Sequence, residues 1–180
     1  MEEKIVYFEK PGQENTPAVF DVVDWALSEL GIRKVVLAST RGDTACYAMD
    51  RYKGQDVRLI VVPHQYGFGP GQRFPPGLVE RAQREGHQVY FGTMLFHQEK
   101  LFGQGPAQWV ASFLRAFCQG VKVCVEILLM AGNAGLVDEG EQVVVVAGTG
   151  RGADTALVMT GATSADLKAM HISRILCKPL

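Results

Sequence analysis

Four consecutive valines, Val143–Val146, constrain the fold of this chain more than any other stretch. A run of β-branched residues without polar alternation is typical of a strand buried on both faces, as in the parallel sheets of α/β proteins. The run leads into the loop Gly148–Gly152, which contains three glycines. Glycines at the end of a strand let backbone amides approach a ligand closely, and successive amides in a turn can bind an anion. This stretch therefore predicts a buried strand that ends at a site for a phosphorylated ligand.

A second copy of this pattern lies upstream, where the apolar run Val35–Ala38 leads into the loop Ser39–Thr44. In both copies an Arg-Gly pair precedes Asp-Thr-Ala. The upstream loop precedes an expected helix over Thr44–Lys53, and the amides and dipole of a helix N-terminus favour an anion. The alternative is an ordinary strand-to-helix turn that Thr44 caps. The candidate ligand contacts in the two loops are Ser39, Thr40, Arg41, Gly42, Asp43 and Thr44, and then Gly148, Thr149, Gly150, Arg151 and Gly152.

Strands alternate with helices along the whole chain, which predicts a three-layer α/β/α fold with a mostly parallel sheet. The expected strands are Lys4–Phe8, Lys34–Ala38, Val57–Val62, Gln88–Phe91, Gln142–Ala147, Thr155–Thr160 and Ile172–Cys177. The expected helices run from Thr16 to Gly31, Thr44 to Lys53, Pro76 to Gly86, Ala107 to Gly120 and Val121 to Ala134. Because β-branched residues without a helical pattern follow the second glycine loop, we expect an antiparallel strand at the end of the sheet. We expect one domain over residues 1–180.

Composition excludes several classes of function. A net charge of −1 gives no general reason for nucleic-acid binding. No long apolar run or signal-peptide pattern is present, so we expect no membrane partner and a cytoplasmic location. The four cysteines form no CxxC pair and the four histidines show no metal-ligand spacing. We therefore expect reduced thiols and no metal site.

Two further groups of residues are candidate ligand contacts. The Gly- and Pro-rich loop Pro63–Pro76 holds His64, Gly67 and Phe68, which either cover a ligand or only anchor the loop. Lys122 and Glu126 are the only charges in the apolar segment Val121–Ala134 and lie four residues apart, on one helix face with Asn133. Either this polar stripe lines a cavity, or it is the solvent side of the helix or an internal ion pair. Because every other face is apolar, we expect Lys122 and Glu126 to be buried.

The stretch GEQVVVVAGTGRGADTALVMT resembles the end of the C-terminal domain of pyruvate kinase, and VVLASTRGDTA resembles the phosphate loop of that domain. Ser39, Gly42 and Thr44 fall on its phosphate-binding hydroxyl and glycine positions. With YFEKPGQENT and KVCVEILLMAGNAGL, the whole chain looks like a family of free-standing, functionally uncharacterised prokaryotic proteins related to this domain. The resemblance implies the fold of the pyruvate kinase C-terminal domain and an association with flavin mononucleotide (FMN). It also implies no pyruvate kinase activity, because the barrel that carries the kinase site is missing from this sequence.

We therefore expect a binding or sensing module for a small phosphorylated molecule, with FMN as the leading candidate. A sugar bisphosphate fits less well, because Arg41 and Arg151 are opposed by Asp43 and Asp154, which suits one phosphate better than two. The alternatives are an enzyme that acts on the same ligand through His64 or the Lys122–Glu126 pair, and an interaction module with vestigial loops. A homo-oligomer is left open by the sequence.

Overall fold

The computed structural model describes residues 3–180, without the side chains at positions 101 and 102, and in that part seven strands form one sheet. The strands are β1 (Val6–Phe8), β2 (Lys34–Ala38), β3 (Arg58–Val62), β4 (Gln88–Val89), β5 (Gln142–Ala147), β6 (Thr155–Thr160) and β7 (His171–Pro179). Their order in the sheet is β1-β7-β6-β5-β2-β3-β4. β6 is antiparallel to both β5 and β7, and the other neighbouring pairs are parallel. The expected antiparallel strand is thus β6, and the sheet continues beyond it with β7 and β1.

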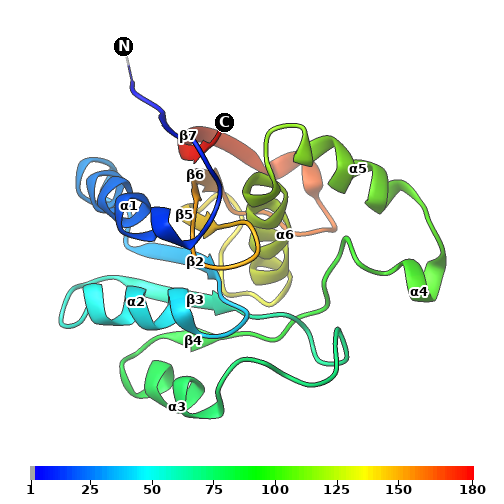
Figure 1. Cartoon of the computed structure of the whole chain (residues 1–180), viewed down its shortest axis with the longest axis horizontal. Coiled ribbons are helices and arrows are strands. Elements are labelled where there is room, and N and C mark those ends of the chain that lie inside the picture. Colours follow the sequence, from blue (N-terminus) through cyan, green and yellow to red (C-terminus); the bar gives the residue numbers. More distant parts are fainter. Residues whose placement is uncertain (1–2) are drawn as a thin grey trace.

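Helices cover both faces of the sheet, which confirms the three-layer α/β/α architecture (Figure 1). They are α1 (Thr16–Leu30), α2 (Asp43–Arg51), α3 (Pro76–Arg84), α4 (Glu99–Phe102), α5 (Pro106–Arg115) and α6 (Gln119–Asn133). α1, α2 and α3 pack on one face, whereas α6 packs on the other. α5 lies against the outer side of α6 (Figure 1).

The alternation of side chains along each strand explains why the central strands are apolar throughout. Val35 and Leu37 of β2 point into the core formed with α1 and α2, and Val36 points into the core formed with α6. All three side chains are fully buried. A strand that contributes to two cores is mostly apolar on both faces. The valine run of β5 obeys the same rule.

α1 begins and ends at the residues that the sequence indicates, but the start of α6 differs from the expected one. Pro17 lies in the first turn of α1, and Gly31 ends the helix at a φ of 66°. The prediction that Gly120 separates two helical segments is wrong, because Gly120 lies inside α6 while Cys118 caps its start. At this glycine, a Cβ would come within 2.0 Å of the Thr155 Oγ1 atom. Gly120 is therefore required by close packing against β6.

The outer face of α5 is apolar and exposed. Of the apolar residues Val110, Phe113, Leu114 and Phe117, Leu114 packs partly buried against the core on the α6 side, whereas the other three are exposed. Phe113 is 70% exposed and the neighbouring Trp109 is 74% exposed, whereas Ala111 is the side chain that α5 buries. The sequence pattern identifies the apolar stripe but cannot say on which side the core lies.

None of the helices within residues 3–180 combines the length and the apolarity that crossing a bilayer requires. The four cysteines are free thiols. Burial raises the pKa of the Cys177 thiol to about 12. Such a thiol is a poor nucleophile at neutral pH.

Candidate functional site

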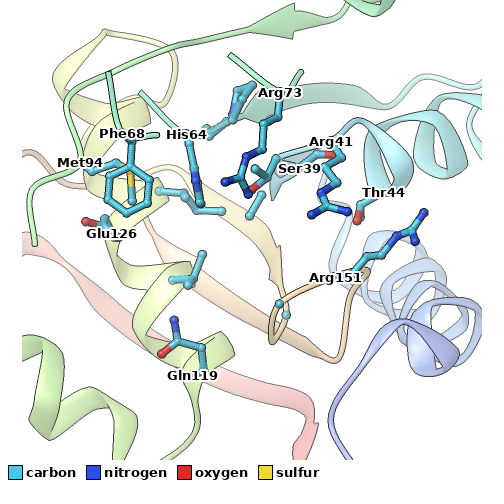
Figure 2. Close-up of a pocket in the computed structure, with 18 of the residues that line it drawn as sticks. Ser39, Arg41, Thr44, His64, Phe68, Arg73, Met94, Gln119, Glu126 and Arg151 are labelled. Atoms are coloured by element: carbon cyan, nitrogen blue, oxygen red, sulfur yellow. The ribbon is translucent and has the colours of Figure 1, made fainter. Parts of the chain in front are cut away.

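A cavity of about 340 Å³ lies at the carboxyl ends of β2, β3 and β5, between α2 and α6 (Figure 2). The chain leaves β2 for β3 on one side and returns to β5 on the other, and such switch points are the usual ligand sites of open α/β sheets. The structure brings thirteen of the sixteen candidate residues to this cavity: Ser39, Thr40, Arg41, Asp43, Thr44, His64, Phe68, Lys122, Glu126, Gly148, Gly150, Arg151 and Gly152. Gly42, Gly67 and Thr149 do not line it.

The loop before α2 presents unbonded amides. The Ser39 hydroxyl accepts a hydrogen bond from the Ala45 amide in the first turn of α2 at 3.1 Å, whereas Gly42 is the N-cap and Thr44 lies inside the helix. Within residues 3–180, no protein acceptor bonds the backbone amides of residues 40–42 and 44. Because these amides lie at a helix N-terminus and have no protein acceptor, they are donors that suit an anion.

Gly42 shapes this loop without lining the cavity. Its φ is 93°, a region that other residues rarely adopt. A Cβ at this position would lie 2.4 Å from Cδ1 of Leu78 in α3. Gly42 is therefore needed for the turn itself.

The second glycine loop is held from inside by Asp154, which is fully buried. Its Oδ2 atom accepts hydrogen bonds from the amides of Thr149 at 2.9 Å and Gly12 at 3.2 Å. Its Oδ1 atom accepts a hydrogen bond from the Thr155 hydroxyl at 2.8 Å. The interpretation that Asp154 opposes a ligand phosphate is wrong, because both of its carboxylate oxygens already accept hydrogen bonds within the protein.

An ion pair joins the two loops at the cavity. The Arg151 guanidinium donates to the Asp43 carboxylate from Nε at 3.2 Å and from Nη2 at 3.1 Å. Both side chains are about half exposed, at 55% and 46%. The hydrogen bond from Arg151 lowers the pKa of Asp43 below its usual value. The two copies of the sequence pattern therefore meet through their charged residues.

A third arginine, Arg73, lines the same side of the cavity. Figure 2 shows Arg41, Arg73 and Arg151 on the side of Ser39 and Thr44. Arg73 lies on the loop that follows β3, in which the side-chain Nε2 of Gln72 donates a hydrogen bond to the His64 carbonyl at 2.9 Å. The cavity therefore has a third arginine besides Arg41 and Arg151 of the two glycine loops.

The opposite side of the cavity holds a cluster of Lys122, Glu126 and His97, in which the His97 side chain is 22% exposed. The Lys122 ammonium lies 2.5 Å from Glu126 Oε2, and both side chains are at most 3% exposed, which confirms their expected burial. Glu126 Oε1 accepts a hydrogen bond from the Phe96 amide at 2.8 Å and lies 3.2 Å from His97 Nδ1. Asn133 does not extend this cluster, because its exposed side chain bonds Ser164 at the far end of α6.

Burial and charge act against each other at this cluster. Burial lowers the pKa of Lys122, and the charge of Glu126 counteracts part of that effect. Burial alone would raise the pKa of Glu126, but the hydrogen bond from His97 and the charge of Lys122 lower it overall. Glu126 is therefore ionised at neutral pH. Burial, followed by the charges of His97 and Arg73, lowers the pKa of His64, so this imidazole is neutral at pH 7.

Aromatic and apolar side chains line the part of the cavity that lies between the arginines and the Lys122–Glu126 pair. The Phe68 ring meets the rings of His64 and His97 edge to face, at centroid distances of 4.7 and 5.2 Å. Sequence reasoning missed several lining residues, among them Arg73, Met94, His97, Gln119, Val123, Ile127 and Met130. Those on loops show no periodicity, and their only indication was the Gly- and Pro-rich composition around them.

Among the described residues, no group of three or more His, Cys, Asp or Glu side chains is arranged to hold a metal ion. The family model of the pyruvate kinase alpha/beta domain matches residues 18–159. The match runs from α1 to β6 and includes both glycine loops and the buried pair of α6. Since it spans most of the chain and the fold has the expected layers, the chain belongs to the pyruvate kinase alpha/beta domain family.

Proposed function

We propose that this chain binds a small phosphorylated molecule in the cavity, as a binding or sensing module of the cytoplasm. One observation carries the proposal: the unbonded amides before α2 lie at a cavity that also carries three arginines. Amides at a helix N-terminus and guanidinium groups are the donors that proteins use for phosphate. The free thiols of the four cysteines agree with a reducing compartment.

We further propose FMN as the ligand, following the family resemblance. An isoalloxazine ring needs a partly apolar slot, and Phe68, Met94 and Ile127 offer apolar walls. The cavity volume of about 340 Å³ lies within the usual range for small-molecule sites, roughly 300–1,000 Å³.

The test is a titration of FMN with the purified full chain, followed by flavin fluorescence and polarisation. Riboflavin, which lacks the phosphate, is the matched control ligand, and fructose bisphosphate is the competitor. We expect FMN to bind more tightly than riboflavin. Unchanged flavin signals at high protein concentration, together with a melting temperature raised by fructose bisphosphate, would reject FMN.

Replacing Arg41 by alanine should weaken FMN binding by about one to two orders of magnitude. A charge-assisted hydrogen bond contributes roughly 1.5–3 kcal/mol, which corresponds to that factor. Calorimetry measures the affinity. Arg33→Ala, at the opposite end of β2, is the control and should leave it unchanged. Equal affinities of Arg41→Ala and the unmodified protein would remove Arg41 from the site.

Replacing Asp43 by asparagine should strengthen FMN binding by about three- to tenfold, an effect of roughly 1 kcal/mol. The change removes a negative charge beside the anion-binding amides and releases Arg151 from its ion pair. The gain should shrink in 1 M salt, because salt screens exposed charges. Weaker binding at low salt would mean that Asp43 supports the ligand directly.

A second proposal, an enzyme acting on the same ligand, is favoured by the neutral His64 imidazole in the cavity wall. A neutral imidazole can accept a proton from a bound substrate. The diagnostic variant is His64→Gln: under this proposal it abolishes turnover and keeps binding, whereas turnover that persists in His64→Gln would reject the role of His64.

A further inference from the structure

The exposed face of α5 carries a row of large aromatic side chains. Trp109, Phe113 and Phe117 follow one another at four-residue spacing and are 74%, 70% and 47% exposed. The rings of Phe113 and Phe117 meet edge to face, with centroids 6.3 Å apart. α5 packs on the outer side of α6, at the periphery of the molecule (Figure 1). These three residues therefore form an aromatic ridge that is open to a partner.

A row of small side chains lies beside the aromatic ridge. Ser112 and Ala116 are both exposed, and each directly precedes a ridge residue in the sequence. Rows of residues at four-residue spacing are the ridges and grooves through which two helices pack. The same face of α5 thus offers a ridge and, next to it, a groove of small residues. Two copies related by a two-fold axis can each place the ridge in the groove of the other, as an isologous interface requires.

The size of the aromatic ridge suits the centre of a dimer interface. Since an aromatic side chain has roughly 150–250 Å² of surface, the three exposed fractions leave roughly 400 Å² of side-chain surface in water. Exposed apolar patches of that size are often functional. A stable interface buries about 800 Å² on each partner and has an apolar centre and a polar rim. The ridge would supply about half of that area, and the groove and its polar surroundings would supply the rest.

Charge separates a second copy of the chain from other partners. Arg115 is the only charged residue between positions 101 and 121. A helix that docks on a membrane surface is typically rich in lysine and arginine on its polar face. A strongly charged protein partner requires charges of the opposite sign. An apolar face with one arginine meets neither requirement, whereas it can pack against its own copy without bringing several like charges together.

We propose that this face of α5 is a homodimer interface, in which α5 packs against α5 of a second copy. Phe113 is the middle residue of the aromatic ridge and lies nearest the two-fold axis. The N-terminal half of one α5 then lies beside the C-terminal half of the other, so that Trp109 meets Phe117 of the second copy. The ridge and groove residues lie outside the cavity lining. The proposal is therefore independent of the ligand, and each copy keeps its own cavity.

The test is sedimentation equilibrium of the full chain at about 1–100 μM, a range that covers interfaces of modest affinity. We expect a reversible dimer of twice the chain mass of 19.7 kDa. In a Trp25→Phe variant, Trp109 is the one tryptophan left in the sequence. Its fluorescence should shift to shorter wavelength as the dimer forms, because dimerisation buries the indole. A chain that stays monomeric over this range, with an unchanged emission wavelength, would overturn the proposal.

Two variants disrupt the interface in different ways. Phe113→Glu places two like charges face to face at the axis and should raise the dissociation constant by at least roughly a hundredfold. Ser112→Trp fills the groove while adding apolar surface, and should raise the constant by at least about tenfold. Trp25→Glu, at a half-exposed position of α1, is the control and should leave the constant unchanged. Circular dichroism checks that each variant folds, and if one of the two does not, the other decides.

Three results would contradict the homodimer. A dimer that neither Phe113→Glu nor Ser112→Trp weakens would have its interface elsewhere. Tighter association of Ser112→Trp than of the unmodified chain would mean non-specific contact between apolar surfaces, because a filled groove cannot receive a ridge. A monomer whose Trp109 emission shifts only when phosphatidylcholine vesicles are added would have a lipid surface as the occupant of this face.

Discussion

Replacing Glu126 by glutamine should lower the free energy of unfolding by roughly 3–5 kcal/mol, the usual cost of breaking a buried ion pair. Its carboxylate accepts from Lys122 and from the Phe96 amide, and its side chain is only 3% exposed. Glutamine would leave the Lys122 ammonium buried without an opposite charge. Urea unfolding followed by circular dichroism at pH 7 measures the loss.

The matched control is Glu85→Gln in the turn that ends α3. Arg81 and Glu85 have the same four-residue spacing, but their side chains are 21% and 26% exposed. We expect a loss below about 1 kcal/mol there. The double variant Lys122→Met with Glu126→Gln should recover most of the loss of the single change, because no buried charge remains. A Glu126→Gln variant as stable as Glu85→Gln would contradict the role assigned to the buried pair.

Replacing Gly132 by alanine should destabilise the fold by about 3 kcal/mol, at the upper end of the usual range for overpacking, roughly 1–3 kcal/mol. Gly132 lies in the last turn of α6, where a Cβ would come within 2.1 Å of the Ala162 carbonyl oxygen. That oxygen belongs to the backbone after β6 and cannot rotate away, so α6 and this segment must separate. Thermal and urea unfolding measure the effect.

The sign of the change in stability distinguishes packing from helix propensity. At an exposed position inside a helix, alanine is more favourable than glycine by up to about 1 kcal/mol. Gly77 in α3 provides the control, because a Cβ there would meet no atom within 4 Å. Gly77→Ala should therefore leave stability unchanged or raise it slightly. Equal losses at Gly132 and Gly77 would show that the contact with Ala162 does not set the stability.

Periodicity and end signals are sufficient for the layers and for most element bounds. β2, β5 and β6 have the bounds that their apolar runs indicate. Sequence reasoning fails where it has to predict which face of a helix is buried and where one helix ends and the next begins. Most of the apolar stripe of α5 faces solvent, and Gly120 lies inside a helix. Tertiary contacts decide whether a stripe meets a core and whether a glycine ends a helix. Neither fact is encoded locally.

Some residues of the candidate site can likewise be predicted from the sequence, and others cannot. The two glycine loops are visible in the sequence because their residues are adjacent and come directly after buried strands. Arg73 and His97 are not, since each comes from an irregular loop whose position depends on contacts such as that between Gln65 Oε1 and the Met94 amide, at 2.6 Å. The two glycine loops also lead into different elements. The first loop enters α2, whereas the second loop joins antiparallel strands and has no helix dipole to offer.

The pairing of β1 with β7 has a consequence for the order in which the molecule assembles. Val6 lies opposite Cys177 in the sheet, and the Leu180 amide donates to the Phe8 carbonyl at 3.0 Å. β1 is synthesised first, yet within the described chain its one sheet neighbour is synthesised last. At ribosomal speeds of about 5–20 residues per second, β1 waits on the order of ten seconds for its partner. We therefore expect the strands from β2 to β6 to assemble while the nascent chain is still growing, with the β1 edge added at the end.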